Sequence, residues 1–141
     1  MNTFIRNFNI QPADVIISPK SGLNFVQHYV IYLGQDEWGN DIFAENKVGH
    51  GVRTIYYDLF AAENPTFNRI NRFNGNEYQR SQAIQRALSL IGRKYNVTNF
   101  NCEHYANYVQ GYKTESKQVE TGFALAGIAL LIFSFAALGS K

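Results

Sequence analysis

Residues 25–45 read FVQHYVIYLGQDEWGNDIFAE, and this stretch contains the pattern of two strands joined by a turn. Residues 25–33 are mostly β-branched or aromatic, a composition typical of a strand. Residues 35–40 have the composition of a turn, and apolar residues return at 41–45. We therefore predict a β-hairpin built from strands 25–33 and 41–45.

Further strands are expected on both sides of this hairpin. Residues 14–17 (DVII) form a short apolar run after Pro12, and residues 52–56 (VRTIY) follow two glycines. Residues 67–73 (FNRINRF) alternate between apolar and polar side chains. Each pattern predicts a strand, so the first half of the chain is expected to form a small antiparallel sheet.

The periodicity changes to that of a helix in the second half. Apolar side chains recur at helical spacing along residues 77–91, and Gly92 is placed to end that helix. A second helix is predicted from Asn101 to Gly111. A small sheet followed by two helices belongs to the α+β class.

Length and charge limit the remaining possibilities. The chain has 141 residues, a net charge of +2 and one cysteine. One domain is expected, and a disulfide framework or a Cys-based structural zinc site is excluded. A cluster of basic residues could face anionic lipid headgroups or form an ordinary solvated face, whereas nucleic-acid binding is less favoured because no binding motif accompanies the charge. The cluster consists of Arg69, Arg72, Arg80, Arg86, Arg93 and Lys94.

The sequence divides into three parts. Residues 8–112 are expected to form the domain, and residues 113–121 a polar linker. Residues 122–138 contain only Gly, Ala, Phe, Leu and Ile apart from Ser134. These 17 residues would span about 26 Å as a helix, close to the thickness of a bilayer core. We therefore predict a C-terminal membrane anchor with the domain in the cytosol; the alternative is a buried core helix.

Cys102 is the candidate nucleophile. It follows Asn101, a good N-cap residue, and so should lie at the first position of the second helix. The free backbone N–H groups and the positive end of the helix dipole favour a thiolate there and could receive an oxyanion. The alternative is a small buried apolar residue.

A thiol nucleophile needs a base, and three histidines are available. His104 lies two residues past Cys102, about 200° around the helix axis, and cannot easily reach the thiol. His50 lies between glycines in a loop. His28 is favoured because a sheet that packs on the helix presents a fixed side chain.

These residues carry a resemblance to a known family. Residues 101–107 (NCEHYAN) resemble the N-C-E-H-F motif of the lecithin retinol acyltransferase (LRAT)-like family, which includes the H-rev107-type phospholipases. Residues 27–34 (QHYVIYLG) are similar to its His-bearing strand, and residues 12–16 (PADVI) to its opening strand. The resemblance covers about residues 10–112 and implies a circularly permuted papain-like (NlpC/P60) fold.

The resemblance implies thiol acyl transfer. Cys102 would attack a phospholipid ester to form a thioester, with His28 as general base and then acid. The third catalytic residue, a His in the H-rev107 type, is not a His here. Glu45 is preferred because a loop of about four residues (35–38) would place it opposite His28, whereas a loop one residue longer would select Asn46.

The expected function is therefore a membrane-anchored phospholipase A or acyltransferase. Its partners would be a phospholipid or other acyl lipid and the membrane, and no cofactor or metal is expected. Two alternatives remain open: a papain-like cysteine peptidase or amidase, because thiolates also attack amides, and a non-catalytic membrane-associated module.

Overall fold

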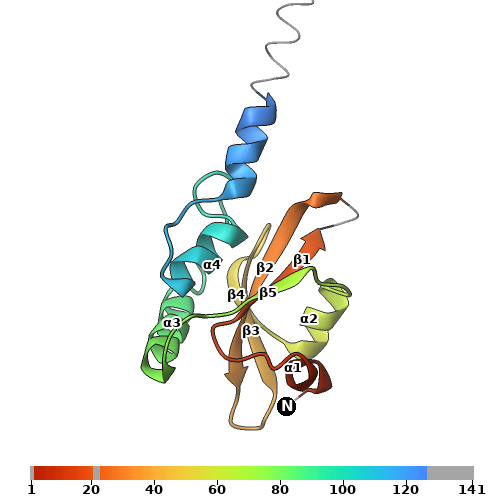
Figure 1. Cartoon of the computed structure of the whole chain (residues 1–141), viewed down its shortest axis with the longest axis vertical. Helices are drawn as coiled ribbons and strands as arrows, with labels where there is room; N and C mark the ends of the chain where they lie inside the picture. Colours follow the sequence, from red (N-terminus) through yellow and green to blue (C-terminus); the bar gives the residue numbers. More distant parts are fainter. Residues whose placement is uncertain (1, 21–22, 127–141) are drawn as a thin grey trace, which may run out of the picture.

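A computed structural model describes residues 2–20 and 23–126, and its core is an antiparallel sheet (Figure 1). Within these ranges the sheet has five strands in the order β4-β3-β2-β1-β5. The strands are β1 (Val15–Lys20), β2 (Leu23–Gln35), β3 (Asp41–Lys47), β4 (Gly51–Tyr56) and β5 (Arg69–Asn71). All the predicted strands are present, and the hairpin of β2 and β3 forms the centre of the sheet.

Four labelled helices accompany the sheet in the described residues. They are α1 (Thr3–Asn7), α2 (Tyr57–Glu63), α3 (Glu77–Ser89) and α4 (Cys102–Gln110). The prediction of α3 and α4 is confirmed, and the α+β class with it. The two short helices α1 and α2 were not predicted, because five and seven residues are too few to show a helical period.

The helices cover the two faces of the sheet in pairs, as Figure 1 shows. Tyr29 and Ile31 of β2 pack in one apolar cluster with residues of α3 and α4. Val30 and Tyr32 alternate with them and pack in a second cluster with residues of α1 and α2. Such alternation is the period of a strand that is buried on both faces.

The ladder between β2 and β3 does not run the full length of β2. Its described pairs extend from Gln35–Asp41 to Val30–Glu45, so residues 23–29 have no partner in β3. The start of α4 lies at this end of the ladder, because the Asn46 amide of β3 donates to the Phe100 carbonyl at 2.7 Å. The candidate site forms here, where β2 extends beyond its ladder with β3.

The chain continues after α4 into a further helical segment, residues 117–126, which rises from the domain beside α4 (Figure 1). Among the described residues, no helix is both long and apolar enough to cross a bilayer. The predicted anchor, residues 122–138, lies outside the described residues from position 127 onward.

Candidate active site

Cys102 is the first residue of α4, as predicted. The Asn101 side chain accepts hydrogen bonds from the N–H groups of Glu103 (2.9 Å) and His104 (3.0 Å). In return, Nδ1 of His104 accepts from the Asn101 N–H at 3.2 Å. The N–H of Cys102 donates no hydrogen bond within the described part of the chain, so it remains available at the positive end of the helix.

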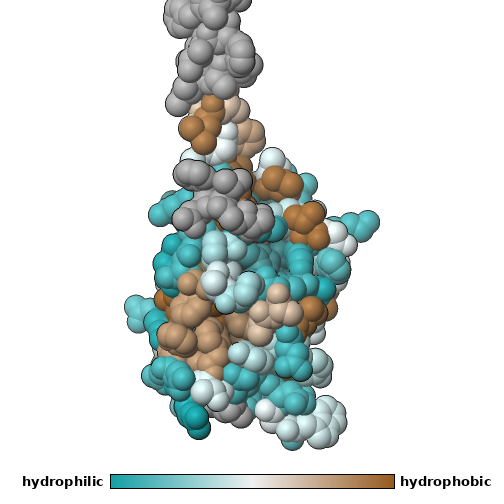
Figure 2. Space-filling model, turned by 90° about the vertical axis from the view of Figure 1, so that its right-hand side faces the viewer, coloured by the Kyte–Doolittle hydropathy of each residue, from teal (hydrophilic) through white to brown (hydrophobic). Residues whose placement is uncertain are grey.

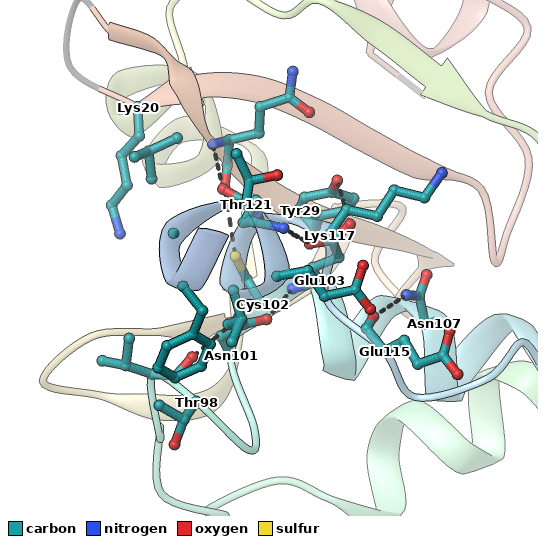
Figure 3. Close-up of a pocket in the computed structure, with 18 of the residues that line it drawn as sticks. Lys20, Tyr29, Thr98, Asn101, Cys102, Glu103, Asn107, Glu115, Lys117 and Thr121 are labelled. Carbon is teal, nitrogen blue, oxygen red and sulfur yellow. Dashed lines mark hydrogen bonds between the residues drawn. The ribbon is translucent and has the colours of Figure 1, made fainter. Parts of the chain in front are cut away.

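The thiol of Cys102 points at β2. Its Sγ donates to the backbone carbonyl of Gln27 at 3.6 Å (Figure 3). Gln27 precedes His28 and lies in the part of β2 that has no partner in β3, which leaves its carbonyl free to accept. The contact therefore holds the nucleophile beside the strand that carries the candidate base.

His28 forms a short, buried hydrogen bond with Glu45. Nε2 of the imidazole and Oε2 of the carboxylate are 2.6 Å apart, and the residues are 7% and 0% exposed. Its other nitrogen, Nδ1, is buried and has no conventional hydrogen-bond partner among the described residues. Because Glu45 occupies Nε2, Nδ1 is the nitrogen left for the thiol.

The predicted register of this contact is wrong, although the expected partner is present. The loop between β2 and β3 spans residues 36–40, and the register shifts between Tyr32 and Gly34, so Glu45 lies opposite Val30. Its carboxylate reaches His28 as a diagonal neighbour on the same face of the sheet. The alternative partner, Asn46, uses its amide on the Phe100 carbonyl instead.

The surroundings of His28 favour its protonated form. Burial alone lowers the pKa, but hydrogen bonds and charges from Cys102 and Glu45 outweigh burial and raise the pKa of His28 to about 9. Burial would raise the pKa of Glu45, yet contacts with His28 and Arg53 lower it. The pair therefore consists of a carboxylate and an imidazolium at neutral pH.

The other histidines lie outside this arrangement. His104 is buried in the capping contact with Asn101, and burial lowers its pKa. His50 is exposed in the turn between β3 and β4, where Nδ1 lies 3.3 Å from the Val48 carbonyl. Of the three histidines, His28 is thus the one whose pKa is raised by both Glu45 and Cys102.

A groove of about 1130 Å³ opens beside Cys102 (Figure 3). Cys102 and Tyr29 line it, and so does the helical segment 117–126. Figure 2 shows apolar surface around the base of this segment. The exposed apolar residues that line the groove are Val26, Val97, Tyr112, Phe123 and Leu125, and the basic ones are Lys20, Arg69, Lys113 and Lys117.

Glu103 ties the segment after α4 to the site, a feature that sequence reasoning missed. Its buried carboxylate accepts hydrogen bonds from the Tyr29 hydroxyl (3.2 Å), the Ser116 hydroxyl (2.7 Å) and the Gln118 N–H (3.2 Å). Gln118 in turn accepts from the N–H of Gln27 at 2.8 Å. Residues 116–118, expected to belong to a linker, therefore pack against the domain.

The predicted basic cluster is largely used inside the fold. Arg72 and Arg80 bind the buried carboxylate of Asp14 at 2.9 and 3.1 Å. Arg86 donates to the Val109 carbonyl, and the Arg93 guanidinium lies 3.7 Å from the centre of the Phe100 ring. These four side chains stabilise contacts between elements.

No protein-family model matches this chain, and the comparisons with curated proteins and with solved structures give no match. Over residues 2–20 and 23–126, no three His, Cys, Asp or Glu side chains gather so that they could hold a metal ion. The geometry of the site is therefore the basis of the functional argument.

Proposed function

We propose that the chain is a cysteine-dependent acyl-transfer enzyme of the phospholipase A or acyltransferase type, with a permuted papain-like fold. The observation that carries the proposal is the Cys102 thiol at the start of α4, beside a His28 imidazole whose far nitrogen is bound by Glu45. A nucleophile, a base and a residue that orients the base are the parts that thiol catalysis requires.

In the reacting form the proton of Cys102 lies on Nδ1 of His28, so that a thiolate faces an imidazolium. The thiolate attacks the ester carbonyl carbon, and the free N–H of Cys102 stabilises the oxyanion. As the C–O bond breaks, Nδ1 of His28 gives its proton to the leaving alcohol, and a thioester remains. Neutral His28 then takes a proton from water or another acceptor, whose oxygen attacks the thioester and releases the thiolate.

The groove supports a lipid as the acyl donor. Its wall combines the thiol with exposed apolar side chains such as Phe123 and Leu125, and it lies against the segment that leads into the apolar run 122–138. An anchor in a membrane would hold the site close to lipid and raise its effective concentration. The resemblance of residues 101–107 and 27–34 to LRAT-like proteins favours the same substrate class.

The test measures fatty-acid release by mass spectrometry from phospholipid vesicles that contain the full chain. Activity should be lost in Cys102→Ser and reduced at least about a hundredfold in His28→Gln, while His50→Gln, which changes an exposed histidine, should remain active. Hydroxylamine should release a trapped acyl group from the wild type. Full activity in Cys102→Ser would overturn the proposal, and cleavage of peptides without lipid turnover would favour the peptidase alternative.

A further inference from the structure

Arg53 binds the carboxylate that orients the candidate base. It lies directly opposite Glu45 in the β3–β4 ladder, and its Nε and Nη2 contact Oε1 at 2.7 and 2.6 Å. Oε2 of the same carboxylate binds His28 at 2.6 Å. The two oxygens of Glu45 are thus divided between the imidazole and the guanidinium.

The guanidinium is held from its other side by α2. Its Nη2 lies 3.0 Å from Oε2 of Glu63, and Glu63 also binds the Lys47 amine at 2.6 Å. Arg53 is 23% exposed at its side chain, whereas Glu45 is fully buried. The chain His28–Glu45–Arg53–Glu63 therefore runs from the buried site to the surface across three strands and a helix.

We propose that Arg53 is a positioning residue for the proposed acyl-transfer site, which keeps Glu45 ionised and oriented so that Glu45 can stabilise the imidazolium of His28. This inference rests on the proposed function only for its effect on turnover. The coupling between Arg53, Glu45 and His28 exists with or without a lipid substrate.

Burial is the reason that Glu45 needs the guanidinium. A carboxylate removed from water tends to take up a proton unless a cation or several donors compensate it. A protonated Glu45 would give His28 no negative partner, and the imidazolium would lose its main support besides Cys102. The titratable and charged groups that face His28 and its partner are Cys102 from α4, Glu45 from β3, Arg53 from β4 and, one step further, Lys47 and Glu63.

The variants Arg53→Met and Arg53→Lys separate charge from geometry. Removal of the cation should raise the pH at which Glu45 takes up a proton. This pH can be measured by ¹³C NMR of the Glu45 carboxyl carbon. The rate at which iodoacetamide alkylates Cys102 should then fall about tenfold at pH 6 in Arg53→Met. The acid limb of the rate profile, the pH range in which the alkylation rate falls on acidification, should move with the Glu45 titration. Arg53→Lys keeps the charge but loses the contact of two guanidinium nitrogens with the carboxylate. The acid limb of the alkylation profile should therefore stay in place while the alkylation rate falls about threefold.

Arg72→Met is the matched control. It breaks a similar contact between an arginine and a buried carboxylate, Asp14, away from the site, and it should leave the alkylation profile unchanged. A folded Arg53→Met variant with the wild-type rate and acid limb would overturn the inference. If Arg53→Met does not fold, Arg53→Lys decides: an alkylation rate equal to the wild type would overturn the inference. These readings need no lipid, so coupling without lipid turnover would count against the proposed function alone.

Discussion

The Cys102 thiol donates to the backbone carbonyl of Gln27, at 3.6 Å, in the part of β2 where the ladder with β3 has ended. The N–H of Gln27 donates to the Gln118 side chain at 2.8 Å. Both backbone groups of one strand residue are thus taken by segments from the other end of the chain. The part of β2 that has no partner in β3 therefore contacts both the nucleophile beside His28 and the segment that follows α4.

The raised pKa of His28 predicts a specific pH dependence of stability. The folded protein holds the His28 proton up to about pH 9, whereas the imidazole of an unfolded chain releases its proton near its ordinary pKa of 6.5. Because the folded state binds this proton more tightly, the stabilisation is complete below pH 6.5 and is lost as the pH rises through about 9.

Urea unfolding of the full chain in detergent, followed by circular dichroism, measures this effect. The free energy of unfolding should fall between pH 6.5 and pH 9 in the wild type, and the fall should be much smaller in His28→Gln. His50→Gln serves as the control and should behave as the wild type. If the free energy of unfolding falls equally with pH in the wild type and in His28→Gln, His28 does not cause the pH dependence.

Glu103→Gln should loosen the segment after α4. The variant keeps the shape of the side chain but offers an amide to the hydroxyl and N–H donors of Tyr29, Ser116 and Gln118. Loss of charge-assisted hydrogen bonds should lower the local opening free energy by about 2 kcal/mol.

Hydrogen exchange at the Gln118 amide, which donates to Glu103, reports this opening directly. Its exchange should accelerate about thirtyfold in Glu103→Gln. Glu115→Gln changes an exposed carboxylate in the same segment and should leave the exchange rate unchanged. Equal rates in the wild type and Glu103→Gln would show that the carboxylate does not hold the segment.

Gly51 and Gly49 offer a matched test of the packing of α3 on the sheet. Both have positive φ, +72° and +81°, so an alanine is strained at either position. A Cβ at Gly51 would in addition lie 2.4 Å from the Arg93 carbonyl oxygen, which accepts the Val52 N–H, whereas a Cβ at Gly49 meets open space.

Gly49→Ala should therefore cost about 1–2 kcal/mol of unfolding free energy from backbone strain. Gly51→Ala should cost at least about 3 kcal/mol, because the backbone after α3 must also move away from β4. Urea unfolding compares the two variants with the wild type. Similar costs at both glycines would mean that the contact with Arg93 relaxes easily.

The local elements were predictable from the sequence because local patterns encode them. The composition of residues 25–33 and the helical spacing of 77–91 correspond to β2 and α3, and the Asn101 cap correctly set the start of α4. His28 was preferred over the other histidines because a strand presents a fixed side chain, and in the structure both Cys102 and Glu45 act on it.

The partners that depend on register were harder to predict. Glu45 was selected from a register that places it opposite His28, whereas it lies opposite Val30, two residues away. It contacts His28 only because diagonal neighbours on a sheet are close enough to touch. Arg53 and the contacts of Glu103 depend on pairing between distant segments, for which one sequence carries no local signal. The short helix α2, which supplies Glu63, has no side-chain cap to mark its start.

The apolar run 122–138 lies mostly outside the described residues. We expect it to insert as a helix with the domain on the cytosolic side, since Lys113 and Lys117 lie just before it and positive charge favours that face.

A charge at the centre of this run, as in Leu130→Arg, should cost about 2.5–3.5 kcal/mol of insertion free energy. The variant should shift toward the soluble fraction after alkaline carbonate extraction, whereas the control Leu130→Ile should stay with the membrane. The alkylation rate of Cys102 should be the same in both variants, because the groove beside it is built from residues before position 127. Release of the wild type into the supernatant would identify the run as a core or surface helix.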